Sequence, residues 1–214
     1  MLRKRSEHSQ VAVAILSRAP IPGQSKTRLI PALGSDGAAE LQRRMLKATV
    51  RSALAANLGP VRLWCAPDPA YPDFAACLLL GTLSLHAQPS GDLGARMLAA
   101  IDHELPTLVV GTDCPGLTPL LLAQAAMALG EAEAVVVPAE DGGYVLIGLR
   151  RPDARLFADI TWGGPLVFEE TRQRLKDCGY RWRELAPLPD VDRPADLARL
   201  AATHRELVAG LLPA

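Results

Sequence analysis

The sequence has few aromatic residues and no net charge, and each of these absences excludes a class of function. Phe, Trp and Tyr make up 4% of the 214 residues, too few for a platform on which the bases of single-stranded nucleic acid would stack. The 23 basic residues balance 23 acidic ones, so no overall field attracts nucleic acid or an anionic membrane. We therefore expect neither as a partner, and any anion must be bound by a local group of residues.

Paired cysteines and targeting segments are also lacking. The four cysteines form no Cys-X-X-Cys pair, so neither a zinc site nor a redox dithiol is indicated, and a reducing cytoplasm fits best. Residues 1–10 are polar and predict a disordered N-terminal extension, while the apolar run 11–16 is too short for a signal peptide or a membrane span. We expect a cytoplasmic protein with a single domain over residues 11–210.

Short β-branched or leucine-rich segments alternate with helical ones, which is typical of layered α/β folds. Strands are predicted over residues 11–16, 61–65, 83–86, 107–110, 134–137 and 144–149. Helices are predicted between the first two strands and over residues 94–104, 119–130, 165–179 and 194–210, several of them beginning at proline and ending at glycine. This alternation predicts a sheet with helices on both faces.

The segment SRAPIPGQSKTRL, residues 17–29, directly follows the first predicted strand, where open α/β sheets bind their ligands. Gly23 lets the backbone approach a bound group, while Arg18, Lys26 and Arg28 supply cations for phosphate oxygens. The spacing matches neither the Walker A nor the GxGxxG motif. A solvated basic turn is the alternative, but three cations crowded onto a loop that prolines stiffen favour phosphate binding.

The segment QPSGDLGARM, residues 88–97, is a turn that enters a helix. Free amides at the start of that helix could hold an anion or the edge of a nucleobase. Asp92 could equally be a simple helix cap. Sequence alone leaves the two interpretations even.

The segment VVGTDCPGLTP, residues 109–119, ends a buried strand in Asp113, which places a carboxylate at the rim of the sheet where it can meet a metal ion. A turn-forming role is the alternative for this residue. Thr118 is predicted to cap the following helix. Cys114 has no nearby histidine to act as a base and is interpreted as a small buried hydrophobe.

Two further segments, PAEDGGY at 138–144 and PDVDRPADL at 189–197, carry carboxylates that could ligate a metal. Magnesium needs only one or two of them when phosphates supply the other oxygens. Asp192 could instead cap the last helix. His204 falls on an apolar stripe and is expected to pack, so no histidine is assigned to catalysis.

In order, the segments AILSRAPIPGQSKTRL, QPSGDLGARM, GTDCPGLTP, PAEDGGYVLIGL, ITWGG and DVDRPADL resemble the DUF2064 family of glycosyltransferase-A-like proteins. The resemblance runs from about residue 11 to residue 200. It implies a GT-A fold, which is Rossmann-like with three layers and a mostly parallel sheet that contains an antiparallel strand. Nucleotide-diphospho-sugar transferases, molybdenum-cofactor guanylyltransferases and 2-phospholactate guanylyltransferases have related folds.

The resemblance also implies roles for individual residues. Lys26 and Asp113 would be catalytic, and Asp113 and Asp192 would hold Mg²⁺ or Mn²⁺. The nucleotide phosphates would be held by Gly23, Lys26 and Arg28. From the segments themselves we expect further nucleotide contacts from Arg18, Gln88, Gly91 and Asp92, and substrate contacts from Asp141, Gly142, Gly143, Tyr144 and Trp162. The chain departs from the family pattern at Arg18, at Ala95 and at the glycine pair 163–164, where lysine, glutamate and a Ser-Thr pair are expected.

The activity implied is metal-dependent glycosyl transfer from a nucleotide-diphospho-sugar to a small-molecule acceptor. Nucleotidylyl transfer from a nucleoside triphosphate is the close alternative, because Lys26 and Arg28 suit the larger charge of a departing pyrophosphate. A non-catalytic nucleotide-binding module is the third hypothesis. Retention of Asp113 and Asp192 disfavours it, since a binding module has less need for two metal carboxylates.

Overall fold

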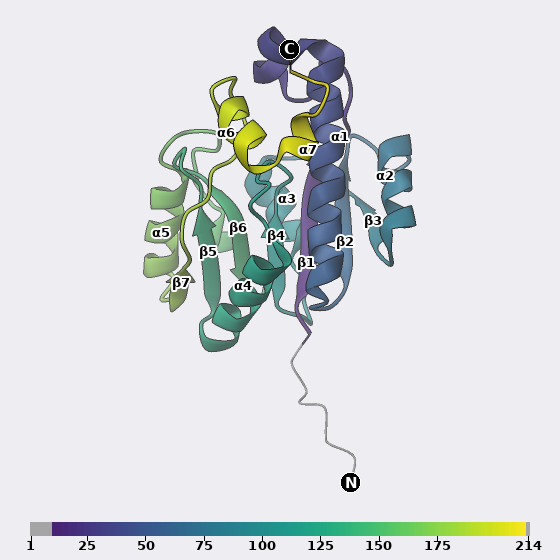
Figure 1. Cartoon of the computed structure of the whole chain (residues 1–214). Helices are drawn as coiled ribbons and strands as arrows, with labels where there is room; N and C mark the ends of the chain where they lie inside the picture. The colour runs from purple at the N-terminus through teal and green to yellow at the C-terminus, as the bar shows by residue number, and fades with distance from the viewer. Residues whose placement is uncertain (1–9, 213–214) are drawn as a thin grey trace.

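The computed structural model describes residues 10–212, which are built around a seven-stranded sheet with the strand order β3-β2-β1-β4-β6-β5-β7 (Figure 1). Along the chain the strands are β1 (Ala12–Arg18), β2 (Val61–Ala66), β3 (Ser84–Ala87), β4 (Thr107–Val110), β5 (Ala134–Pro138), β6 (Tyr144–Leu149) and β7 (Trp182–Glu184). β6 runs antiparallel to β4 and β5, and the other neighbours are parallel. The predicted α/β fold, mostly parallel with an antiparallel strand, is confirmed.

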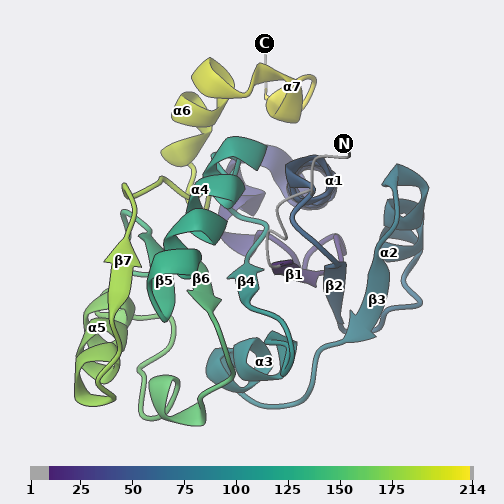
Figure 2. The same cartoon turned by 90° about the horizontal axis from the view of Figure 1, so that it is seen from below.

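The helices are α1 (Ile30–Ala56), α2 (Pro72–Cys77), α3 (Leu93–Ala100), α4 (Pro119–Glu131), α5 (Val167–Asp177), α6 (Asp196–Thr203) and α7 (Arg205–Val208), with 3-10 turns η1 (Thr27–Leu29), η2 (Leu78–Leu80) and η3 (Ala154–Leu156). Figure 2 shows α3 and α5 on one side of the sheet and α1 and α4 on the other. The expected three layers are therefore present. α6 and α7 form an additional cover outside α1.

The sheet is buried on both faces because its strands alternate apolar side chains between two cores. In β1, Val13 and Ile15 belong to the core beneath α1 and α4, whereas Ala14 belongs to the core beneath α3 and α5. A third cluster joins the outer side of α1 to α6 and α7. β1 itself is therefore anchored in both layers.

The strand β7 and the helix α2 were not predicted, and the predicted helices 94–104 and 165–179 are shorter in the structure, as α3 and α5. β7 is three residues long, Trp-Arg-Glu, and carries no apolar run. α2 is a six-residue helix. α3 ends at Ala100 because the Asp102 carboxylate accepts hydrogen bonds from the amides of Glu104 and Leu105 and forms a turn.

The predicted C-terminal helix over residues 194–210 is two helices. The chain leaves helical geometry at His204, with φ −139° and ψ 60°. His204 is partly buried at this break, and its Nδ1 lies 3.0 Å from the Thr203 hydroxyl. The leucines of the predicted stripe, at positions 197, 200 and 207, are buried as expected. The predicted N-terminal extension lies outside the described residues, apart from Gln10.

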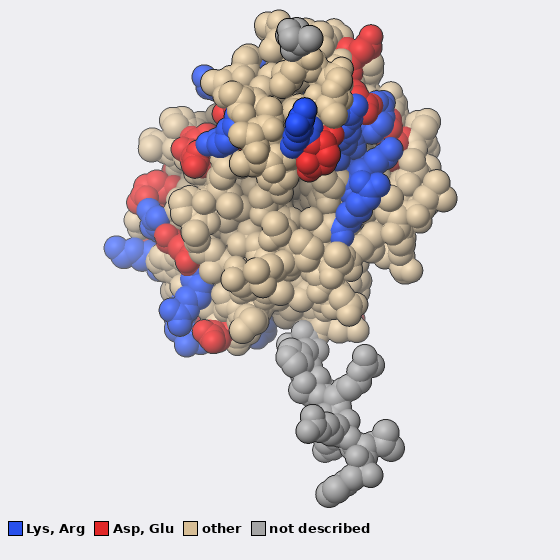
Figure 3. Space-filling model, in the orientation of Figure 1, with Lys and Arg blue, Asp and Glu red and all other residues tan. Residues whose placement is uncertain are grey.

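Charged side chains of both signs are interspersed on the face formed by α1 and α4 (Figure 3). Most of α4 carries no charge, its only charged residue being Glu131 at its end, and Leu120 and Met127 of this helix are exposed. Among residues 10–212, no helix combines the length and the apolar character that crossing a bilayer requires. The anion-binding groups must therefore be sought locally, at the edge of the sheet where β1 and β4 end and β6 begins.

Gly148 in β6 tests how closely this sheet is packed. A Cβ atom added there would lie 2.6 Å from Val135 Cγ1 and 2.7 Å from Leu108 Cδ2. Because neighbouring strands cannot yield easily, Gly148→Ala should lower the free energy of unfolding by about 1 to 3 kcal/mol. Gly130→Ala is the control, since nothing lies within 4 Å of its added Cβ and alanine favours helix. Urea unfolding measures both, and equal effects would contradict the packing argument.

Candidate functional site

A cleft of about 840 Å³ opens at the edge of the sheet where β1 and β4 end. Parallel strands bring their carboxyl ends to one edge, so the loops that follow them meet there. The segments that line the cleft are distant in sequence: 16–18, 24–28, 88–97, 109–114, 139–145, 162–167 and 190–192. All the motifs selected from the sequence thus contribute to one cleft.

Most of the predicted site residues line this cleft. They are Arg18, Lys26, Arg28, Gln88, Gly91, Asp92, Asp113, Asp141, Gly143, Tyr144, Trp162 and Asp192. Gly23 and Gly142 do not. Gly23 is an exposed turn residue with φ +78°. Gly142, with φ +92°, packs against Pro165, whose carbonyl oxygen would lie 1.9 Å from an added Cβ, so its place is structural.

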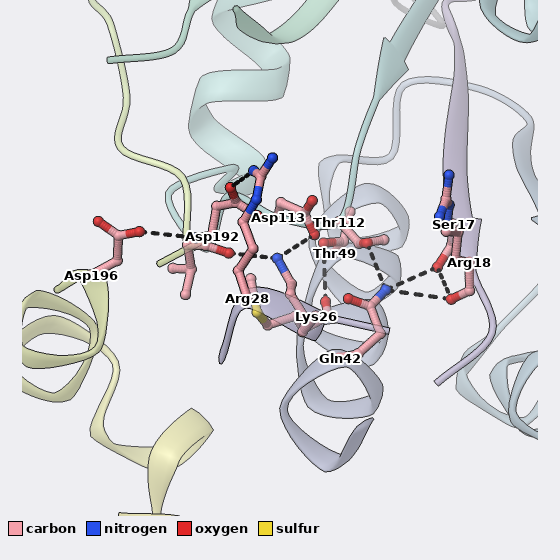
Figure 4. A network of polar contacts seen from close by, with 12 residues as sticks. Ser17, Arg18, Lys26, Arg28, Gln42, Thr49, Thr112, Asp113, Asp192 and Asp196 are labelled. Carbon is pink, nitrogen blue, oxygen red and sulfur yellow. Dashed lines mark hydrogen bonds and ion pairs between the residues drawn. The ribbon is translucent and has the colours of Figure 1, made fainter. Parts of the chain in front are cut away.

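Lys26 is the central cation of the cleft. Its backbone is left-handed, with φ 50°, and its side chain is only 4% exposed. The ammonium lies 2.7 Å from Asp113 Oδ1 and donates a hydrogen bond to the Val191 carbonyl at 2.5 Å (Figure 4). The Val191 amide in turn donates to the Asp113 carbonyl at 2.8 Å. One lysine therefore joins the loop after β1 to the loop after β4 and to the segment 190–192.

Arg28 and Asp192 form a second ion pair beside the first (Figure 4). The Arg28 side chain is 64% exposed, so this cation faces solvent. Asp192 is not the cap of the last helix, which corrects the structural alternative. α6 begins at Asp196, and its N-cap position is Ala195, which has no side-chain cap. The Asp196 carboxylate accepts hydrogen bonds from the amides of Asp192 and Arg193 and so holds the segment before the helix.

The donor set for a metal ion is small. Among residues 10–212, no three His, Cys, Asp or Glu side chains are grouped closely enough to form a metal site from protein ligands alone. Asp113 and Asp192 lie in segments joined through Val191, and each pairs with its cation through one oxygen, Oδ1 and Oδ2 respectively. The second carboxylate oxygen of each aspartate takes no part in these ion pairs. The pair therefore suits a divalent cation that takes its remaining ligands from phosphates and water.

Asp190 is a site residue that the sequence analysis missed. Burial and, to a smaller extent, the nearby charges of Asp141, Asp113 and Asp192 together raise the pKa of its carboxyl to about 6. The sequence did hold a signal, since Asp190 and Asp192 flank the buried Val191 in Pro-Asp-Val-Asp. In an extended segment, residues two apart point the same way. The cleft thus holds more acidic charge than its two ion pairs neutralise.

Gln42 on α1 was also missed, and it positions the loops of the cleft. Its side chain is buried, and its amide donates to Thr112 Oγ1 at 3.0 Å, next to Asp113. It also lies 3.4 Å from the Arg18 carbonyl. The contact ties the ends of β1 and β4 together. The available signal was a polar residue on the helix face that also carries the buried Leu41 and Met45.

Several predicted residues have structural contacts. The Gln88 amide nitrogen donates to the carbonyls of Ser17 and Trp64, at 2.9 and 2.8 Å, and so bridges β1 and β2. The Asp92 carboxylate accepts a hydrogen bond from the Ala95 amide at 2.8 Å and caps α3. Thr118 caps α4 as expected. Cys114 is a buried thiol whose pKa is raised to about 11 by burial, which fits the predicted small hydrophobe.

Comparison with known proteins agrees with this architecture. The sequence profile of the family described as "Uncharacterized protein conserved in bacteria (DUF2064)" matches residues 49–164. A protein from Desulfovibrio desulfuricans G20, provisionally named a nucleotide-diphospho-sugar transferase, is 28% identical with a TM-score of 0.79 over 92% of this chain and 89% of that one. No curated protein is similar in sequence.

Two more distant structures share the fold. CMP:2-keto-3-deoxy-manno-octonic acid synthetase, complexed with CTP, is 13% identical with a TM-score of 0.57 over 92% of this chain and 99% of that one. Rv0371c from Mycobacterium tuberculosis H37Rv, in complex with manganese, is 18% identical with a TM-score of 0.53 over 91% of this chain and 100% of that one. At these identities the likeness is one of fold alone.

The raised pKa of Asp190 predicts a pH-dependent stability. Because the carboxyl titrates at about 6 in the folded chain instead of its usual 3.8, the native state binds more protons between these values, and stability falls as the pH rises through them. Asp190→Asn cannot ionise. It should therefore raise the thermal midpoint at about pH 7.5 and have little effect at about pH 4.

The exposed Asp36 outside the cleft supplies the matched control. Asp36→Asn should leave the difference in thermal midpoint between about pH 7.5 and about pH 4 as it is in the parent protein. A gain from Asp190→Asn of the same size at both pH values would show that the effect does not come from ionisation.

Proposed function

The chain belongs to the DUF2064 family, and we propose that it is a transferase that uses a nucleotide-activated donor, with glycosyl transfer from a nucleotide-diphospho-sugar to a small acceptor as its reaction. The observation that carries the proposal is the meeting of Lys26 and Arg28 with Asp113 and Asp192 in one cleft. Cations for phosphates and carboxylates for a metal are the groups that such a donor requires. The similarity to the Desulfovibrio protein supports this reaction class.

The donor's diphosphate would be held by Lys26 and Arg28. The Lys26 ammonium is nearly inaccessible to solvent, so its attraction for an anion in the cleft is weakly screened. Arg28 is exposed and can turn toward an incoming phosphate. In the reaction the bond between the sugar's anomeric carbon and the diphosphate breaks, the acceptor oxygen bonds to that carbon, and the acceptor hydroxyl releases its proton. The two cations then stabilise the charge gained by the departing diphosphate.

Asp113 and Asp192 would hold Mg²⁺ or Mn²⁺ through the oxygens that their ion pairs leave free. When bound, such an ion neutralises negative charge on the donor phosphates. Manganese is bound by the Mycobacterium tuberculosis protein of the same fold, which supports a divalent ion here. Phosphates bound to Lys26 and Arg28 would compete with the carboxylates for these cations, and Asp113 and Asp192 would then be available to hold the ion. Donor and metal should therefore bind more tightly together than separately.

Nucleotidylyl transfer from a nucleoside triphosphate is the second candidate. The complex of the related synthetase fold with CTP supports it, and so does the pairing of a buried cation with an exposed one, which suits a departing pyrophosphate. The two reactions leave different products. Glycosyl transfer releases a nucleoside diphosphate, whereas nucleotidylyl transfer releases pyrophosphate.

We further propose a cytoplasmic setting for the protein. All four cysteines are free, and three of them are buried, which supports the reducing cytoplasm expected from their spacing. We further propose that residues 11–210 act as one domain, since the segments lining the cleft extend from residue 16 to residue 192. Donor and acceptor would both be small molecules.

The reaction is tested by incubating the protein with nucleoside triphosphates and nucleotide-diphospho-sugars, each with Mg²⁺ or Mn²⁺, and assaying nucleoside diphosphate and pyrophosphate separately. Metal-dependent release of nucleoside diphosphate from one sugar nucleotide is expected. Asp113→Asn should lower that rate roughly hundredfold, while Asp36→Asn should not. Release of pyrophosphate instead would establish the second candidate. Nucleotide binding without either product would support a binding module.

The role of Lys26 is tested separately by nucleotide binding. Lys26→Ala should weaken binding of the nucleotide with Mg²⁺ roughly tenfold or more, because a charge-assisted hydrogen bond is worth about 1.5 to 3 kcal/mol. Lys47→Ala removes a cation of α1 that does not line the cleft and should change little. Calorimetry measures both, with circular dichroism to show that each variant is folded. Equal losses from the two substitutions would refute the role of Lys26.

A further inference from the structure

The α3 side of the cleft holds two hydrogen-bond donors that no residue of the described chain satisfies. The Nε of Arg96 and the indole Nε1 of Trp162 are both buried without a partner. Both residues line the cleft. Between residues 10 and 212, no ion pair involves the Arg96 side chain. Because buried N–H groups are nearly always paired in folded proteins, two such groups beside one cleft call for an explanation.

These donors belong to one wall. Trp162 packs on α3 at Gly94, where an added Cβ would lie 2.8 Å from Trp162 Cζ2. Tyr144 reaches the same helix three residues further on, with its hydroxyl 3.7 Å from Met97 Sδ. Both contacts fall on the turn of α3 that includes Arg96, although Arg96 projects from a different side of the helix than Gly94 and Met97. Thioether sulfur is a weak acceptor, and burial raises the pKa of Tyr144, so its phenol stays a protonated donor.

Other arginines of the chain show what a structural guanidinium does here. Arg44 donates to the carbonyls of Leu207 and Ala209. Arg150 likewise donates to the carbonyls of Leu129 and Gly130. Each joins two elements through backbone acceptors, whereas Arg96 has a buried donor with no acceptor. A purely structural role does not account for this arginine.

We propose that Arg96 and Trp162 belong to the acceptor subsite and that Arg96 binds a carboxylate or phosphate group of the acceptor there. The inference rests on the proposed transferase function. The donor phosphates already have Lys26 and Arg28, which lie on the loop leading into α1. α1 and α3 lie on opposite faces of the sheet (Figure 2). A planar guanidinium suits a carboxylate or phosphate because it donates two parallel hydrogen bonds. The Trp162 N–H would supply a further donor.

The test measures anion binding without turnover. Inorganic phosphate in one series and lactate in another are titrated against the protein at ionic strength matched with chloride, and binding is followed by the rise in thermal midpoint. Arg96→Gln should weaken binding of at least one of the two anions roughly tenfold or more. Arg151→Gln is the control, because Arg151 is exposed and lies outside the cleft. The anion that responds identifies the acceptor group.

Two further variants keep the outcome interpretable. Trp162→Phe preserves an aromatic ring against α3 but removes its N–H, so a smaller, few-fold loss of anion affinity is expected. This variant still tests the subsite if Arg96→Gln does not fold. Lys26→Ala should leave the Arg96-dependent anion binding in place. Unchanged affinity in both Arg96→Gln and Trp162→Phe, or no anion binding to the parent protein, would overturn the proposal. Since no product is measured, that result would leave the donor reaction standing.

Discussion

The structure of the cleft depends on one buried ammonium group. Lys26 Nζ contacts the Asp113 carboxylate and the Val191 carbonyl, and these three residues come from the loop after β1, the loop after β4 and the segment before α6. Loops that carry so much charge would repel one another if they met without a cation between them. The lysine, held in a left-handed conformation by the turn, therefore fixes the position of both acidic segments.

The same interaction makes the cleft responsive to its ligands. Lys26 and Arg28 are each neutralised by a carboxylate, so the protein itself satisfies its phosphate-binding cations. A phosphate that replaces a carboxylate on a cation leaves that carboxylate in need of a new positive charge, which a divalent ion supplies. Asp190 increases this need, because its pKa is already raised by burial and by the charges of the same acidic group. Phosphate and metal are thus alternatives to the internal ion pairs.

Much of the fold and of the cleft could be predicted from sequence, and there are physical reasons why the other features could not. The longer strands and the loops that follow them were predictable because period and position are local properties, as Lys26 and Asp113 illustrate. Contacts such as that of Lys26 with Val191, 165 residues apart, depend on how elements pack. Asp190, Gln42 and Arg96 were missed for the same reason, since their significance lies in burial and in partners. β7 was missed because a three-residue edge strand with two charges carries no periodic signal.

The two layers of the fold also divide the chemistry of the cleft. The side next to α1 places cations and carboxylates in mutual contact, an arrangement that suits a ligand bringing both negative charge and a metal ion. The α3 side has donors without partners, in Arg96 and Trp162, an arrangement that suits a group bringing acceptors alone. A sheet edge between two helical layers can hold two different substrates with their reacting atoms at its rim. A transferase needs that separation, because each substrate must be recognised without occupying the place of the other.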